Sequence, residues 1–411
     1  MVSLLTDVST EMVYPLLPFY LTLRLGASPA VLGFIEGLAE SLASLLKVVA
    51  GRVSDRLRRR KGLAVAGYAA STVGKVLLYL AGSWGGVLAG RLADRFGKGI
   101  RTAPRDAIVA ESSPEGRRGW AFGLHRTMDT FGAAAGALLA YILLVGLSGG
   151  AAKGNYRPIF LFSLIPAAIA VAVLLWVRET GGAPVAATGR ERELIAAAPA
   201  GGSGREPATR SIVSAHRSTW ATLRTLDPRL LTLLVVTGVF TLGNSSNQFL
   251  LLRVGQTLGP AAAVLVYALY NLVYAAFSWP AGWLSDRIGR QKILVAGFGL
   301  YAVVYGGLAF GVGEASWGYP VLFSLYGVYS ALTDGVAKAL VADFAPGDLR
   351  ATVIGLHATI VGIGLFPASL LAGVLWTTFG PAAAFGLGAV AGLAAAVGLA
   401  FFPRRRRRSE T

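Results

Sequence analysis

The sequence has no cysteine, only three histidines and three methionines, and few charged residues, 14% of 411. Without cysteine, neither a disulfide framework nor a thiolate metal site can form, and three histidines disfavour an imidazole-rich site, so we expect no metal or cofactor. A soluble chain carries about 25% charged residues. The low charge, 54% hydrophobic residues and mean hydropathy of +0.60 therefore indicate a polytopic membrane protein.

The apolar residues fall into twelve segments, each near the length of about 20 residues that a membrane-spanning helix needs. They predict an all-α membrane protein of two six-helix bundles, residues 1–180 and 227–411, the second ending in a basic cytoplasmic tail. A Gly-, Ala- and Pro-rich linker, 181–226, joins them. We expect no cleavable signal peptide, because Met1 leads directly into the first span. The predicted spans are 2–24, 29–51, 62–82, 84–110, 119–145, 158–177, 229–252, 260–282, 292–313, 318–343, 351–376 and 380–402.

The net charge of +17 is explained by membrane orientation rather than by nucleic-acid binding. Most Lys and Arg residues outside the spans fall on the side that holds both termini. The other side holds only Arg24, Lys153, Arg157 and Arg253. Because basic loops stay in the cytoplasm, we expect both termini there, in the cytoplasmic (inner) membrane of a prokaryote.

The fourth span carries more charge than a lipid-facing helix tolerates. At 100° per residue its charged side chains fall within an arc of about 140°. Each would cost about 2.5 kcal/mol or more against lipid, so this face must point to protein or to a water-filled cavity. The face consists of Arg91, Asp94, Arg95, Lys98, Arg101, Arg105 and Asp106.

The two halves repeat one another, which indicates an internal duplication. The repeated segments are 51–61 and 282–292, 107–114 and 339–346, and 123–127 and 355–359. The first pair resembles the G-x-x-x-D-R-x-G-R-[RK] loop of the major facilitator superfamily, with Arg58 where glycine is usual. The run Arg95-Phe-Gly-Lys-Gly99 is similar to that family's R-x-x-Q-G motif, and Gly132-x-x-x-Gly136 to its exporters' G-x-x-x-G-P motif without the proline.

This resemblance implies two bundles that rock about a central site lined by the first, fourth, seventh and tenth spans, in a protein that can work as a monomer. It also implies a proton-transfer role for Arg95. The repeated loops place Asp55 and Asp286 at span ends, where they can pair with nearby arginines and cap a helix. The predicted cytoplasmic latch is Gly51, Asp55, Arg56, Gly282, Asp286, Arg287 and Arg290.

The N-terminal half carries nearly equal numbers of intramembrane acids and bases, which indicates pairing. A structural ion-pair network is expected for Arg91, Asp94, Arg105, Asp106, Glu111 and Arg126. Because buried pairs stabilise a fold only weakly, some of the charges are expected to serve function. The proton-coupling candidates are Asp7, Glu11, Glu36, Glu40, Arg95 and Asp129.

The C-terminal half offers neutral hydrogen-bonding groups and tyrosines, which suit recognition of an organic solute. Asp334 and Lys338 interrupt this neutrality; they pair within their own helix or reach into the cavity. The substrate-cavity candidates are Tyr14, Lys98, Arg101, Asn244, Gln248, Tyr267, Asn271, Tyr274, Asp334 and Lys338.

These features predict a secondary transporter of a small solute, and the first functional hypothesis is proton-coupled efflux of organic compounds. The alternative is a carrier of a carboxylate- or phosphate-bearing solute that uses the basic face of the fourth span. A membrane enzyme or receptor is the third class. It is disfavoured because the sequence contains no G-x-x-x-x-G-K-[ST], G-x-S-x-G or H-E-x-x-H motif.

Overall fold

The computed structural model describes residues 1–57, 60–111, 118–148, 155–176, 228–312, 317–344 and 350–401, and these form helices and short connections without strands. Eight segments in these ranges are long and apolar enough to cross a membrane. The predicted linker, 181–226, and the basic tail lie outside the described residues.

The helices of the N-terminal half agree closely with the predicted spans. A broken first span is followed by α3 (Pro29–Leu57), α4 (Arg60–Leu80), α5 (Trp84–Glu111), α6 (Arg118–Ser148) and α7 (Arg157–Trp176). The first span comprises α1 (Val2–Val13), η1 (Tyr14–Leu16), α2 (Leu17–Phe19) and a π-helical turn, η2 (Tyr20–Arg24). Pro15 and Pro18 interrupt it because proline donates no backbone hydrogen bond and crowds the preceding turn.

In the C-terminal half, the prediction of one continuous helix over 229–252 is wrong. The chain leaves α11 (Pro228–Gly243), passes through Asn-Ser-Ser-Asn at 244–247 and enters α12 (Gln248–Leu258). Short polar side chains compete with the helical hydrogen bonds there. The remaining helices are α13 (Pro260–Ile288), α14 (Arg290–Ala309), α15 (Gly318–Phe344), α16 (Arg350–Phe379) and α17 (Pro381–Ala400).

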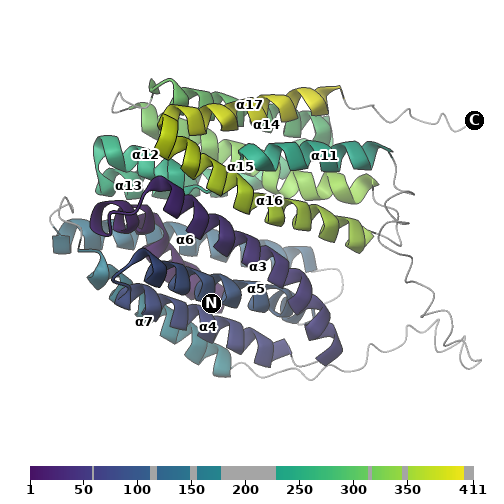
Figure 1. Cartoon of the computed structure of the whole chain (residues 1–411). Helices are drawn as coiled ribbons and strands as arrows, with labels where there is room; N and C mark the ends of the chain where they lie inside the picture. The colour runs from purple at the N-terminus through teal and green to yellow at the C-terminus, as the bar shows by residue number, and fades with distance from the viewer. Residues whose placement is uncertain are drawn as a thin grey trace, which may run out of the picture.

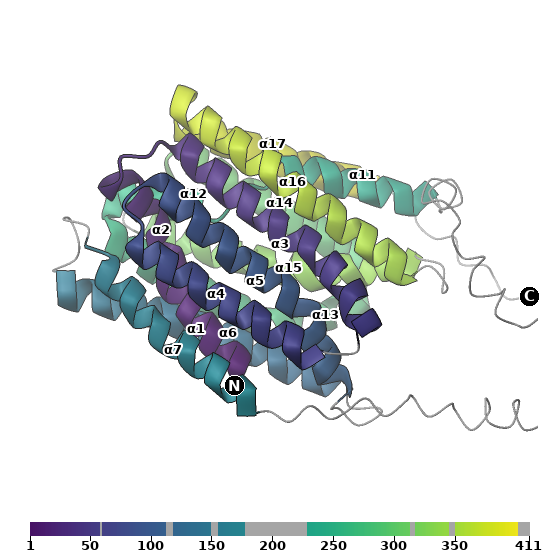
Figure 2. The same cartoon turned by 60° about the horizontal axis from the view of Figure 1, so that its bottom comes forward.

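The two halves lie side by side, with α3 running along α16 in both views (Figures 1 and 2). The second contact joins α6 to α13. Each contact pairs the second span of one half with the fifth span of the other, so the halves are related by an approximate two-fold arrangement.

Close approach between α3 and α16 depends on glycine. A Cβ at Gly33 would overlap with the Ser369 carbonyl, and one at Gly37 would lie 2.9 Å from the Phe366 carbonyl oxygen. Ser41 also donates a 2.6 Å hydrogen bond to the Gly362 carbonyl. Small residues at such contacts let helix backbones pack directly, as in other membrane bundles.

Candidate functional site

The charged face of α5 meets acids of α3 in the interior of the N-terminal half. Arg91 donates from Nε and Nη2 to the two carboxylate oxygens of Glu36, at 2.7 and 2.6 Å, and both side chains are buried. Arg95 lies 3.2 Å from Glu40, whose side chain is 29% exposed. The predicted proton-coupling candidates Glu36, Glu40 and Arg95 therefore belong to one network with Arg91.

Asp94 lies at the centre of this network. It contacts Arg91 at 3.5 Å, Arg95 at 3.4 Å and Lys75 of α4 at 3.8 Å. The network thus contains three acids and three bases, named Glu36, Glu40, Asp94, Lys75, Arg91 and Arg95. Opposite charges balance within it, which is how charge is accommodated inside a membrane protein.

Glycines bring α4 close enough to α5 for Lys75 to reach Asp94. A Cβ at Gly74 would lie 2.5 Å from the Asp94 backbone nitrogen, and one at Gly67 would lie 2.7 Å from the Gly97 carbonyl. Lys75 is one of the intramembrane bases counted from the sequence, but it was not predicted as a site residue. Its position one residue after a helix-packing glycine was the available signal.

The basic residues of α5 that follow Arg95 in the sequence have different contacts from those of Arg91 and Arg95. The guanidinium of Arg101 lies 4.5 Å above the ring of Tyr68 and donates to Ser71, so this predicted cavity residue is packed against α4. Arg105 pairs with Asp106 at 2.9 Å. Lys98 is half-buried and has no hydrogen-bond or ion-pair partner among the described residues. Of the predicted basic ladder, Lys98 is therefore the cation that remains available to another group.

Glycines of α6 hold the acids of α1 against that helix. A Cβ at Gly136 would lie 2.9 Å from Cβ of Glu11, and one at Gly132 would lie 3.2 Å from Cβ of Asp7. Glu11 accepts a 3.0 Å hydrogen bond from Tyr267 of α13. This contact crosses from one half to the other.

The other two α1–α6 acids differ in their contacts. The Asp7 carboxylate is half-buried and has no hydrogen-bond or ion-pair partner in the described part of the chain. Asp129 of α6 accepts a 2.5 Å hydrogen bond from Ser3 and lies 3.4 Å from His125. Asp129 therefore joins α6 to the beginning of α1. The side chains of Glu111 and Arg126 lie outside the described residues.

Two predicted polar residues of the C-terminal half donate hydrogen bonds to backbone carbonyls at the centre of the molecule. Gln248 is buried and donates a 2.9 Å hydrogen bond to the Tyr14 carbonyl, again across the halves. Asn271 donates to the Tyr267 carbonyl within α13 at 3.1 Å. Asn244, expected on one helical face with Gln248, lies instead in the break between α11 and α12.

Asp334 and Lys338 do not form an ion pair with each other. Asp334 accepts a 2.9 Å hydrogen bond from Tyr274, and Lys338 is exposed one turn further along α15. The pairing alternative for these two residues is therefore wrong in the described structure.

Tyrosines form a larger aromatic cluster than the sequence analysis identified. The α13 rings of Tyr267, Tyr270 and Tyr274 stack at centroid distances of 5.6 and 6.2 Å, and Tyr14 lies 5.8 Å from Tyr267. Four missed tyrosines extend this stack through α14 and α15; they are Tyr301, Tyr305, Tyr326 and Tyr329. Their spacing of four and three residues within two spans was the signal that could have found them.

The charged side chains of the predicted latch lie within the described residues only in the second copy of the repeat. Arg290 lies 3.1 Å from Asp286 and 2.6 Å from Asp343, and so connects α14 to α13 and α15. Arg287 stacks on Trp283 at 3.8 Å. In the first copy, a Cβ at Gly51 would lie 3.6 Å from the Cβ of Ala103. The side chains of Asp55 and Arg56 lie outside the described residues, and a Cβ at Gly282 would meet open space.

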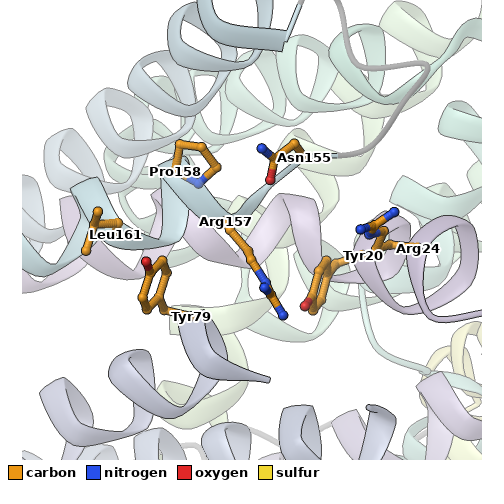
Figure 3. Close-up of a pocket in the computed structure, with 7 residues that line it drawn as sticks. All are labelled: Tyr20, Arg24, Tyr79, Asn155, Arg157, Pro158 and Leu161. Carbon is orange, nitrogen blue, oxygen red and sulfur yellow. The ribbon is translucent and has the colours of Figure 1, made fainter. Parts of the chain in front are cut away.

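A separate cavity of about 560 Å³ lies away from these charges, between η2, the end of α4 and the beginning of α7 (Figure 3). Its lining residues are Tyr20, Arg24, Tyr79, Asn155, Arg157, Pro158 and Leu161. None of them was a predicted site residue.

Comparison with known proteins identifies the class that this architecture defines. A family model described as Major Facilitator Superfamily matches residues 1–259 and 233–411. An uncharacterized MFS-type transporter of Methanocaldococcus jannaschii is 35% identical over 382 residues, which cover 91% of this chain and 86% of that protein. Two solved structures share the fold, a D-xylose–proton symporter and the nucleoside transporter NupG. The symporter has a TM-score of 0.72 and 17% identity, and the match covers 98% of this chain and 97% of that chain. NupG has a TM-score of 0.71 and 12% identity, and the match covers 97% of this chain and 96% of that chain.

A helical membrane protein of two pseudo-symmetric bundles that meet at a polar interface is a solute transporter by class. The chain belongs to the major facilitator superfamily. It is an integral membrane protein, and its family membership indicates transport rather than catalysis.

Proposed function

We propose that this transporter exports small organic compounds by alternating access in exchange for protons. The observation that carries the proposal is the hydrogen bond from Tyr267 to Glu11, because it places a titratable carboxylate between the two halves. When the halves rock, such a contact has to form and break. A carboxylate that gains and loses a hydrogen-bond donor changes its affinity for a proton, which links proton movement to the transport cycle.

Neighbouring groups support proton exchange around α1. Asp7 lies one turn from Glu11 and has no hydrogen-bond or ion-pair partner among the described residues. Glu40, which forms an ion pair with Arg95, is partly exposed. Asp129 contacts Ser3 at the beginning of the same span. We assign the coupling role to Asp7, Glu11, Glu40 and Asp129 with Arg95, and a positioning role to the fully buried Glu36.

The solute would contact the aromatic side of the interface. Tyr14, Tyr267 and Tyr274 offer ring faces, and Asn244 lies in the break between α11 and α12. Planar or lipophilic organic compounds suit such walls. In this proposal the protein works as a monomer in the inner membrane of a prokaryote, with both termini in the cytoplasm.

The alternative, a carrier of an anionic solute, rests on Lys98. Arg91 and Arg95 are neutralised by acids, and Arg101 is packed on Tyr68. On the fourth span, an anion would therefore find Lys98 available. The sequence instead suggests a basic ladder of five residues, Arg91, Arg95, Lys98, Arg101 and Arg105. This balance of charge favours the exporter.

The two functions are distinguished with purified protein in liposomes that contain a pH-sensitive dye and experience an imposed pH gradient. Lipophilic cations and neutral aromatic compounds are compared with organic and phosphorylated anions. For the exporter we expect a dye response to the first group that is lost in Glu11→Gln and retained in Asp106→Asn, an acid that pairs with its neighbour Arg105. A response to anions alone, lost in Lys98→Gln, would assign the anion carrier. Full coupling in Glu11→Gln would contradict the proposed coupling site.

A further inference from the structure

The cavity beside η2 combines two arginines with aromatic walls, and none of the described residues that line it is an acid (Figure 3). Arg24 is exposed and has no hydrogen-bond or ion-pair partner in the described part of the chain. Arg157 donates one 3.3 Å hydrogen bond to the Ala81 carbonyl and is otherwise exposed to the cavity. Two guanidinium groups without a carboxylate partner therefore face one hollow.

Local structure fixes the position of Arg157. The Ala81 carbonyl, just beyond the end of α4, accepts hydrogen bonds from both Arg157 and the Tyr20 hydroxyl. A cation at a helix C-terminus is favoured by the helix dipole. One edge of the guanidinium is used in this contact, and the remaining donors can bind a ligand.

The distribution of charge makes this pair unusual. At or beyond the ends of the predicted spans, the face of the protein that carries few basic residues has only four, and two of them line this cavity. General attraction to an anionic membrane surface would not concentrate them in one place. Paired arginines in a recess are suited to a phosphate or carboxylate group because each presents a planar set of donors.

The rim of the cavity continues onto the lipid-facing surface. Leu161 lines the cavity and is 47% exposed, and Ile165 and Ile169 extend the exposed apolar stripe of α7 by one and two turns. A molecule with a charged head and a hydrocarbon tail could place the head between the arginines and the tail along this stripe.

We propose that this cavity binds a negatively charged phosphate group, supplied by an anionic phospholipid headgroup or by free phosphate. The apolar stripe beside it favours the phospholipid. Binding here is independent of the transported solute and of proton coupling, because none of the lining residues belongs to the charged network or to the aromatic cluster described above.

The test measures binding of fluorescent phosphatidylglycerol to the purified, delipidated full chain in detergent, with unlabelled phosphatidylglycerol, phosphatidylcholine and inorganic phosphate as competitors. We expect Arg24→Gln and Arg157→Gln each to weaken binding by about tenfold, the effect of losing one charge-assisted contact. Arg253→Gln is the matched control, since Arg253 is on the same face outside the cavity. Its affinity should stay within about twofold of the unsubstituted protein.

Competition identifies the source of the phosphate. Displacement by phosphatidylglycerol alone assigns the lipid headgroup, whereas displacement by inorganic phosphate at comparable concentration assigns free phosphate. Unchanged binding in Arg24→Gln and Arg157→Gln, or an equal loss in Arg253→Gln, would overturn the proposal. The Arg24 variant is decisive even if the Arg157 variant folds poorly, because Arg24 makes no described contact that folding could require.

Discussion

Arg91 and Glu36 form a buried, two-point ion pair between α5 and α3, with N–O distances of 2.7 and 2.6 Å. Both side chains are buried, with exposures of 2% for Arg91 and 0% for Glu36. The pair ties the charged fourth span to the helix that also forms the principal contact with the other half.

Glu36→Gln is predicted to destabilise the protein strongly. Removing one member of a buried pair typically costs about 3–5 kcal/mol. Here it would leave the network of three acids and three bases with an excess positive charge, although Arg91 would still contact Asp94. Asp286→Asn breaks a pair whose acid is 65% exposed and should cost less than about 1 kcal/mol. Thermal unfolding in one detergent compares the two, and equal melting temperatures would contradict the prediction.

Gly33→Ala is predicted to impair transport and stability by separating α3 from α16. The added methyl would overlap with the Ser369 carbonyl, which is backbone and cannot move alone. Gly299→Ala in α14 is the matched control because its Cβ would meet nothing within 4 Å. There alanine should be neutral or stabilise the helix by up to about 1 kcal/mol. Transport rates and melting temperatures would both be measured, and Gly33→Ala matching its control would refute the packing argument.

A cross-link between positions 30 and 377 is predicted to stop transport. The Ala30 amide donates a 3.1 Å hydrogen bond to the Thr377 hydroxyl, so the two residues are in direct contact and a disulfide between them can test whether they separate. The natural sequence has no cysteine to compete. In the double variant Ala30→Cys and Thr377→Cys, oxidation should arrest transport and a reductant should restore it. Each single variant, treated identically, should remain active. If the oxidised, cross-linked protein transports as fast as the protein treated with reductant, this end of the α3–α16 contact need not open during transport.

Tyr301→Phe and Tyr305→Phe are predicted to differ, although their rings stack at 4.0 Å one turn apart. The Tyr301 hydroxyl donates a 3.0 Å hydrogen bond to the Gly243 carbonyl at the end of α11. Its removal leaves a buried carbonyl without that donor, at a cost of about 1–3 kcal/mol. The Tyr305 hydroxyl is buried with no hydrogen-bond partner in the described part of the chain, so Tyr305→Phe should be neutral or stabilising. Unfolding measurements that rank the variants in the opposite order would contradict this assignment.

Much of the fold was predictable because hydrophobic length determines where a chain crosses a membrane. The helix limits of α4, α5, α7 and α15 differ from the predicted spans by about two residues or fewer. The break at Pro15 was not predicted because apolar residues continue through it. The break at Asn244–Asn247 was not predicted because these four polar residues are short and lie between two apolar runs.

The sequence predicted which charged and polar groups belong to the candidate site, but not which of them contact one another. Near-equal charge indicated pairing, but sequence could not show that Glu36 selects Arg91 or that Lys75 joins Asp94, because partners on different helices depend on rotation and packing. The grouping of Arg24 with Arg157 likewise arises from three chain segments that meet only after folding.

The break after Gly243 divides the seventh span between two neighbourhoods. Helix α11 packs on α16 and α17, whereas α12 reaches α2 and α3 of the other half and places Gly255 against the ring of Phe19. Because the helical hydrogen bonds are interrupted between them, α11 and α12 are not one rigid rod. The seventh span therefore joins a helix packed within its own half to a helix that touches both halves.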